Sequence, residues 1–142
     1  MKITQIQQKS PEFKEFESQQ WQLQDTQHFG HDTNWNKSQY YLEAEDDGQI
    51  VGIIEMKLKG GVAKIESLLV KEDKHRQGIG RKLVAEAEAI AKEAGAHKVY
   101  LISGKDWQAV RFYQALGYDN EGLLRRHHQG EDYIQFSKFL DG

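Results

Sequence analysis

Hydrophobic residues from position 39 onward cluster in short segments that turn-forming residues separate. Residues 40–44, 50–58 and 62–70 are such segments, and Asp46-Asp47-Gly48 and Gly60-Gly61 lie between them. Asp-Gly and Gly-Gly pairs between segments of strand length are typical of tight β-hairpins. The pattern therefore predicts an antiparallel meander of three strands.

The middle of the chain changes from strand-like to helical periodicity. Apolar residues within 81–94 fall on one helical face, Gly78-Ile79-Gly80 opens this helix, and Gly95 is expected to end it. Residues 99–102 predict a buried strand. Because a helix connects the strands 62–70 and 99–102, we expect these two strands to be parallel.

The last third predicts one helix and one hairpin. Asp106 is expected to cap a helix over 106–116, which Gly117 closes. Residues 118–128 and 132–140 predict a hairpin around Gln129-Gly130. The predicted fold is an α/β (α+β) fold. It has a mixed, largely antiparallel sheet, a central parallel crossover pair and flanking helices.

The first 38 residues are rich in glutamine and poor in apolar residues. Lys2 to Gln7 predict an edge strand, and Ser10-Pro11-Glu12 predicts a helix start with serine as the cap and proline in the first turn. Residues 25–38 predict a loop. The helix is expected to turn three aromatic side chains inward, namely Phe13, Phe16 and Trp21.

Composition limits the possible functions. The 142 residues are 38% hydrophobic and 29% charged, which predicts one globular domain over 1–142. The net charge of −3 argues against a nucleic-acid partner, and the absence of cysteine excludes disulfides and thiolate catalysis. No segment has the apolar length of a signal peptide or a membrane span, so we expect no membrane association and a cytoplasmic location.

The segment IESLLVKEDKHRQGIGRKL, residues 65–83, carries the candidate chemistry. A strand leads into a glycine-containing loop, and the unpaired N–H groups of the next helix point into that loop, which suits a pyrophosphate. The third glycine of a dinucleotide-binding motif is missing, and so is the lysine of a P-loop. At this point, glycines that serve only to start the helix remain an alternative.

A second segment makes the motif more specific. After Val70, the residues His75-Arg76-Gln77-Gly78-Ile79-Gly80 resemble the acetyl-CoA-binding motif of the GNAT superfamily of N-acetyltransferases. Residues 106–118, DWQAVRFYQALGY, are similar to a later block of the same superfamily. Two residues depart from the pattern: His75 replaces an arginine or glutamine, and Asp106 replaces a frequent asparagine.

The resemblance covers residues 39–139 and implies an acetyl-CoA-dependent N-acetyltransferase. It implies that Leu68, Leu69 and Val70 bind the pantetheine arm through their backbone, with the N–H of Leu68 or Leu69 as the oxyanion donor. It places Tyr113 as general acid near the sulfur. It implies a pyrophosphate site formed by His75, Arg76, Gln77, Gly78, Ile79, Gly80 and Arg81. No metal is needed.

Several of the residue roles have an alternative interpretation. Glu66 is the candidate general base, or else a solvent-facing strand residue, and Tyr113 could be a core residue. His28, His31 and Asp32 form a weak metal pattern. His127-His128 with Glu131-Asp132 could border the acceptor or form a solvated turn, and Asp32, Trp35 and Trp107 could also face the acceptor.

The acceptor is expected to be a small-molecule or peptide amine, and a homodimer is one option that the resemblance implies. Direct transfer in a ternary complex is favoured because no cysteine exists to carry an acetyl group. The alternatives are a non-catalytic CoA or acyl-CoA sensor on the same fold, and a protein that binds ATP or NAD in the same loop.

Overall fold

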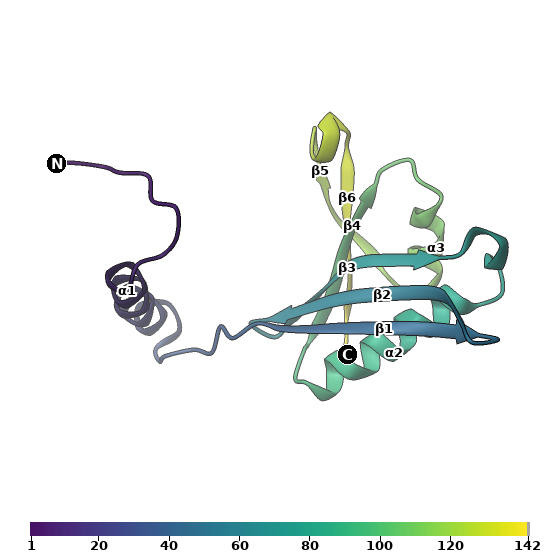
Figure 1. Cartoon of the computed structure of the whole chain (residues 1–142), viewed down its shortest axis with the longest axis horizontal. Helices are drawn as coiled ribbons and strands as arrows, with labels where there is room; N and C mark the ends of the chain where they lie inside the picture. The colour runs from purple at the N-terminus through teal and green to yellow at the C-terminus, as the bar shows by residue number, and fades with distance from the viewer. Residues whose placement is uncertain (142) are drawn as a thin grey trace. The chain divides into compact units, whose positions relative to one another are not determined.

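A computed structural model describes residues 1–141 of the chain (Figure 1). These residues form two compact units, Met1–Trp35 and a second unit that begins at Asn36. The helices and strands, in chain order, are α1 (Pro11–Phe29), β1 (Ser38–Asp46), β2 (Gln49–Lys59), β3 (Val62–Val70), η1 (Glu72–Lys74), α2 (Ile79–Glu93), β4 (Lys98–Gly104), α3 (Ala109–Ala115), β5 (Asp119–Leu124), η2 (His128–Gly130) and β6 (Tyr133–Phe139).

The second unit is built on a sheet with the strand order β1-β2-β3-β4-β6-β5. The pairs β1–β2, β2–β3, β4–β6 and β5–β6 are antiparallel, whereas β3 and β4 are parallel. The predicted fold class is therefore confirmed, including the central parallel pair. The Asp47-Gly48 hairpin is confirmed as well, because both residues have positive φ angles, 50° and 75°.

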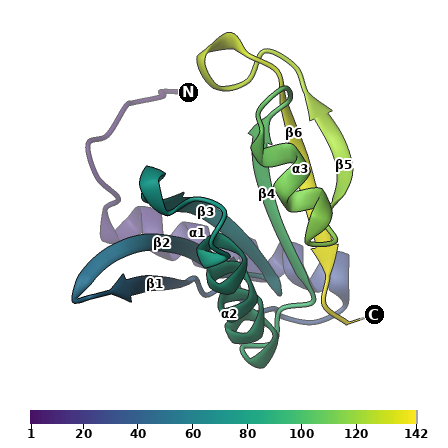
Figure 2. The ribbon, with the colours of Figure 1, turned by 90° about the vertical axis from the view of Figure 1, so that its right-hand side faces the viewer.

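The parallel pair is short. The pairing joins Val62–Lys64 of β3 to Lys98–Tyr100 of β4, and beyond these residues the two strands run apart (Figure 2). Helix α2 packs against β1, β2 and β3, and α3 packs against β4. The C-terminal half of β3 thus has no strand on its β4 side, although β2 still pairs with its other side.

Helix α2 confirms the predicted apolar face, since Leu83, Val84, Ala87 and Ala91 are buried. The helix lies close to the sheet at Gly52, where an added Cβ would stand 3.0 Å from side-chain atoms of both Ile79 and Leu83. Gly95 adopts a φ of 94° just after the helix, as a C-terminal glycine does.

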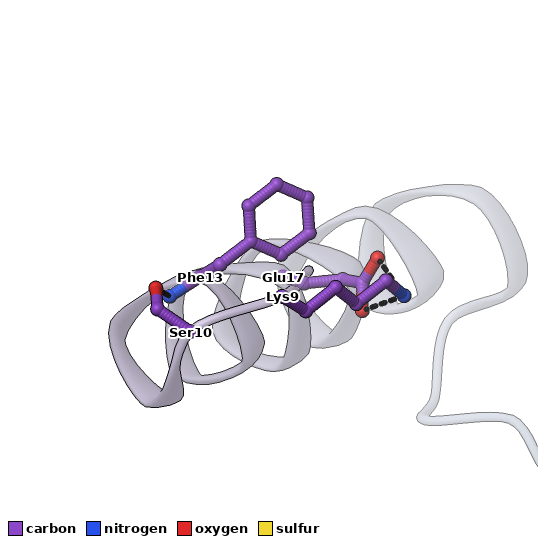
Figure 3. A network of polar contacts seen from close by, with 4 residues as sticks. All are labelled: Lys9, Ser10, Phe13 and Glu17. Carbon is purple, nitrogen blue, oxygen red and sulfur yellow. Dashed lines mark hydrogen bonds and ion pairs between the residues drawn. The ribbon is translucent and has the colours of Figure 1, made fainter. Parts of the chain in front are cut away.

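The first unit contains α1, whose start follows the prediction. Ser10 Oγ accepts a hydrogen bond from the Phe13 N–H at 3.1 Å, and Lys9 Nζ lies 3.0 Å from Glu17 Oε1 (Figure 3). The helix ends at Gly30, which has a φ of 81°. The serine cap joins residues three positions apart, which is why the sequence predicted it.

Other predictions for the first unit are wrong. Lys2 to Gln7 form no strand, and α1 continues through Phe29, so residues 25–29 are helical rather than loop. The aromatic residues predicted to point inward are exposed: Phe13 by 42%, Phe16 by 67% and Trp21 by 55%. The buried residue of α1 is Asp25, whose carboxylate accepts hydrogen bonds from Trp35 Nε1 at 3.0 and 3.1 Å.

Two corrections concern the second unit. Helix α3 begins at Ala109 instead of 106, because a turn in which the Trp107 N–H donates to the Gly104 carbonyl precedes it. The connection between β5 and β6 is longer than the predicted turn at 129–130 and contains η2. In this connection, the Asp132 carboxylate accepts a hydrogen bond from the Arg126 N–H at 2.9 Å.

Candidate active site

A cavity of about 620 Å³ opens beside the unpaired half of β3. Four segments of the second unit line it: the end of β3, the loop after it, the start of α2 and one face of α3. The lining residues are Leu68, Val70, Lys74, His75, Arg76, Gly78, Ile79, Gly80, Arg81, Gln108, Ala109, Phe112 and Tyr113. Segments about 40 residues apart in the sequence thus meet at one site.

Backbone groups of β3 face the gap between the diverging strands. The Lys71 N–H donates to the Val51 carbonyl of β2 at 2.8 Å. In an antiparallel pair, alternate residues direct their N–H and C=O groups to opposite edges of the strand. Counting back from Lys71, Leu69 directs these groups toward β2, whereas Leu68 and Val70 direct theirs toward the unpaired edge. The N–H of Leu68 can therefore donate to a ligand at the unpaired edge. The N–H of Leu69 cannot, because it points toward β2.

The loop between β3 and α2 is held by a contact to that same edge. An imidazole nitrogen of His75, Nε2, lies 2.9 Å from the Val70 carbonyl oxygen. Arg76 has a φ of 67° and Gly78 a φ of 82°, both in the left-handed region that non-glycine residues rarely adopt. This geometry brings the chain to the first turn of α2, whose N–H groups have no partner within the helix.

The charged residues that line the cavity, Lys74, Arg76 and Arg81, are all basic. They come from the loop and the start of α2, and the imidazole of His75 lies in the same loop. Lys74 also lies 3.5 Å from the Asp46 carboxylate. The other part of the lining is apolar, with Leu68, Val70, Ala109 and Phe112. A ligand that suits these residues carries negative charge at one end and a less polar segment at the other.

Tyr113 stands in the apolar part of the cavity and is 7% exposed. Its ring contacts those of Phe112 and Tyr118, with centroid distances of 5.0 and 5.8 Å. Burial raises the pKa of Tyr113 to about 12 because the phenolate form would lose its hydration. Its hydroxyl forms no hydrogen bond to another residue within 1–141, so it is free to donate to a ligand. Tyr113 is therefore buried as a core residue is, and it also lines the cavity. Its role as general acid stays a prediction.

Three predicted site residues do not line the cavity: Glu66, Leu69 and Gln77. Leu69 is 63% exposed because strand alternation places its side chain on the sheet face opposite Leu68. Glu66 is the additional residue of a β-bulge, since Ile65 pairs with Met56 and Ser67 with Glu55. Its carboxylate lies 3.8 Å from Lys57 Nζ and 3.7 Å from Lys64 Nζ.

The bulge changes the side of the strand on which Glu66 lies. Simple alternation from Val70 would put Glu66 on the cavity side, as it does for Leu68. The ion pairs with Lys57 and Lys64 instead place Glu66 on the opposite face, since these lysines neighbour the buried core residues Met56 and Ile65 along their strands. The role of Glu66 stays a prediction.

The sequence interpretation missed Lys74, Gln108, Ala109 and Phe112 as lining residues. Lys74 belongs to the same polar loop as Arg76, and its charge was an available signal. Ala109 and Phe112 precede Tyr113 by four residues and one residue, and Ala109 therefore shares a helical face with Tyr113. The position of Gln108 depends on where α3 begins, which the sequence did not predict.

Neither a metal site nor a membrane-spanning helix occurs in the described part of the chain. Among residues 1–141, no group of three or more His, Asp or Glu side chains is arranged to hold a metal ion. The imidazole Nδ1 of His31 instead lies 2.8 Å from the Asp32 carbonyl oxygen. No helix in these residues combines the length and the apolar character needed to cross a bilayer.

Comparison with known proteins agrees with this geometry. An acetyltransferase from Bacillus cereus ATCC 14579 has a TM-score of 0.72 at 25% identity, over 96% of this chain and 98% of that chain. A GNAT family acetyltransferase from Elizabethkingia anophelis, solved with acetyl-CoA bound, has a TM-score of 0.68 at 19% identity, over 72% and 77% of the two chains.

A third similar structure is the ribosomal-protein-S18-alanine N-acetyltransferase from Escherichia coli, with a TM-score of 0.66 at 20% identity, over 72% and 69% of the chains. No curated protein matches the chain in sequence. The acetyltransferase (GNAT) family matches residues 2–118, which is most of the chain. By this match, and by the fold and cavity described above, the chain belongs to the GNAT family of acetyltransferases, whose cosubstrate is acetyl-CoA.

Proposed function

We propose that this chain transfers the acetyl group of acetyl-CoA directly to a primary amine of a small molecule or peptide. The observation that carries the proposal is a single cavity that joins a basic loop, the free edge of β3 and the unpartnered hydroxyl of Tyr113. Acetyl-CoA supplies the acetyl group and leaves as the CoA thiol. Residues of this chain bind the cosubstrate, stabilise the developing charges and remove the proton from the amine.

The basic part of the cavity suits the phosphates of the cosubstrate. His75, Arg76 and Arg81 line it, and the first-turn N–H groups of α2 add donors that need no side chain. Arginine binds phosphate oxygens with charge and paired hydrogen bonds. We infer that this end anchors the cosubstrate, and that the apolar end receives the arm and the thioester.

The Leu68 N–H is our proposed oxyanion donor. Negative charge develops on the acetyl oxygen as the amine attacks, and a fixed N–H that already points at this oxygen stabilises the charge without reorganisation. Leu68 directs its N–H toward the unpaired edge of β3, whereas Leu69 directs its own toward β2. This orientation favours Leu68 over the alternative that the sequence left open.

Tyr113 is proposed to stabilise the departing sulfur. With a pKa of about 12, its phenol keeps its proton throughout the neutral range and can donate a hydrogen bond there. Complete proton transfer to a thiolate whose acid has a pKa of about 8.5 is uphill, because each pKa unit corresponds to about 1.4 kcal/mol. We therefore expect Tyr113 to act mainly as a hydrogen-bond donor to the departing sulfur, and the thiolate takes its proton from water as it leaves.

The amine must lose a proton before it attacks, since a lysine-like amine has a pKa of about 10.4. If the cosubstrate arm fills the cavity, the amine reaches the thioester from the opposite face of the sheet. Glu66 lies on that face, next to the gap between β3 and β4. We propose Glu66 as the base, acting directly or through water.

The test combines binding and turnover. Calorimetry should show that the wild-type chain binds CoA and acetyl-CoA more tightly than ATP or NAD. Thiol release with a panel of small amines and peptides should then show turnover. Tyr113→Phe is expected to lower kcat by about 100-fold, which is typical of a lost acid catalyst, while the Kd for CoA stays nearly unchanged.

Tyr41→Phe is the matched control, because Tyr41 is 65% exposed on β1 and does not line the cavity. It should leave both kcat and the Kd unchanged. CoA binding without release of thiol for any amine would support the alternative of a CoA sensor. Equal affinity for ATP and CoA would contradict the proposal altogether.

A further inference from the structure

Gln108 lines the cavity but was assigned no role by its sequence position. It precedes the first residue of α3, and its side chain does not cap that helix. The side-chain amide forms no hydrogen bond to any other residue among 1–141. An exposed glutamine without a partner, at the wall of a ligand cavity, can bind a ligand at little cost to the fold.

The surroundings of Gln108 narrow what it can bind. Its neighbours in the cavity wall on α3 are Ala109, Phe112 and Tyr113, none of which carries charge at neutral pH. The basic residues come from the other wall, formed by the loop and the start of α2. Gln108 is the one lining residue with a side-chain amide, and an amide can both donate and accept.

A side-chain amide among uncharged neighbours suits the middle part of the proposed cosubstrate. The arm between the phosphates and the sulfur contains amide groups separated by aliphatic segments. Moving an amide from water to an apolar wall is unfavourable unless it finds a hydrogen-bond partner. The free edge of β3 supplies backbone partners at Leu68 and at the Val70 N–H on one side, whereas the Val70 carbonyl already faces His75 Nε2. Gln108 stands on the α3 side.

We propose that Gln108 binds an amide group of the cosubstrate arm through its side-chain amide. It thereby selects for ligands that carry this arm over ligands that carry only the nucleotide end. Asp106, which occupies the superfamily's frequent asparagine position, does not line the cavity. The inference rests on the proposed function and adds a specificity residue to it.

The test uses the full chain and two ligands. CoA carries the arm, and adenosine 3′,5′-bisphosphate carries only the nucleotide end. Gln108→Ala should weaken CoA binding by about threefold to tenfold, which corresponds to one neutral hydrogen bond, and should leave the affinity for the bisphosphate unchanged. Gln108→Glu keeps an acceptor but loses the amide donor, so it should also weaken CoA selectively.

Gln114→Ala is the matched control, because Gln114 is exposed on the same helix and does not line the cavity. It should leave both affinities unchanged. Equal weakening of both ligands by Gln108→Ala, or no weakening of CoA, would overturn the inference. Failure of the wild-type chain to bind CoA would instead contradict the proposed function, so the two failures are distinguishable.

Discussion

Gly80 stands in the first turn of α2 with the Phe112 ring close to its backbone. An added Cβ would lie 3.2 Å from Phe112 Cζ, which is tighter than ordinary contact. Phe112 also lines the cavity, so the missing side chain of Gly80 allows this ring its present position. One residue thus links the start of a helix to the shape of the site.

Gly80→Ala should weaken CoA binding without lowering the free energy of unfolding. Alanine favours a helix over glycine by about 1 kcal/mol, so the free energy of unfolding should be maintained or slightly raised. The displaced Phe112 ring should narrow the cavity and weaken CoA binding. Urea unfolding and calorimetry measure the two effects. Gly122→Ala is the control, because no atom lies within 4 Å of its added Cβ; if both variants bind CoA equally well, Gly80 has no part in shaping the site.

The bulge in β3 is the element that arranges the two sides of the proposed reaction. It leaves Leu68 and Val70 on the cavity side and brings Glu66 to the opposite face beside Lys57 and Lys64. Because the bulge adds one residue to β3 only, it also disturbs the ladder next to the point where β3 and β4 part. The bulge therefore sets the face on which the candidate base lies, and it follows directly after the last residue of β3 that pairs with β4.

Glu66→Gln tests this arrangement. The amide keeps the size of the side chain but cannot accept a proton, so kcat should fall by about 100-fold or more if Glu66 is the base. The Kd for CoA should not change, because Glu66 does not line the cavity. Glu55→Gln, on the neighbouring strand, is the control. Unchanged kcat over pH 6 to 9 would show that the amine loses its proton by another route.

At the scale of the whole second unit, a partly buried network joins α2, β6 and the connection between α3 and β5. The Tyr118 hydroxyl donates to Glu88 Oε2 of α2 at 2.6 Å, and Lys138 Nζ of β6 donates to Glu88 Oε1 at 2.9 Å. Lys138 also donates to the Leu116 carbonyl at 3.0 Å. Burial, and then the bond to Glu88, raise the pKa of Tyr118 above its ordinary value. Both Tyr113 and Tyr118 thus hold their protons more firmly in the folded chain.

Stability should therefore decrease at high pH. A phenol with a raised pKa in the folded state contributes its full stability below the unfolded pKa of about 10 and loses it as the pH rises further. Urea unfolding at pH 8, 10 and 11 should show this decrease. Tyr118→Phe should lower the free energy of unfolding by about 1–2 kcal/mol at pH 8, because its hydrogen bond to a carboxylate is lost. Above pH 10, the free energy of unfolding of this variant should fall less steeply with pH than that of the wild type. If the free energy of unfolding falls equally steeply with pH in the variant, groups other than Tyr118 cause the loss of stability.

Much of the second unit could be predicted because its signals are local. Asp47 and Gly48 specify their turn by the φ angles they tolerate, and the apolar face of α2 follows from residues three and four apart. The first unit was harder to predict. Its aromatic residues suggested a buried face for α1, yet the buried residue is Asp25, whose partner Trp35 is ten residues away.

Local patterns were enough to predict the strands of the second unit, the α2 helix and the glycine-containing loop with its basic residues, since each depends on backbone preferences and neighbours within one or two turns. The tertiary structure alone decided which amide of β3 is free, on which face Glu66 lies, and that Gln108 joins the cavity wall. These features depend on where β3 leaves β4 and where α3 begins. Such positions are fixed by packing between segments far apart in the chain, which no local pattern records.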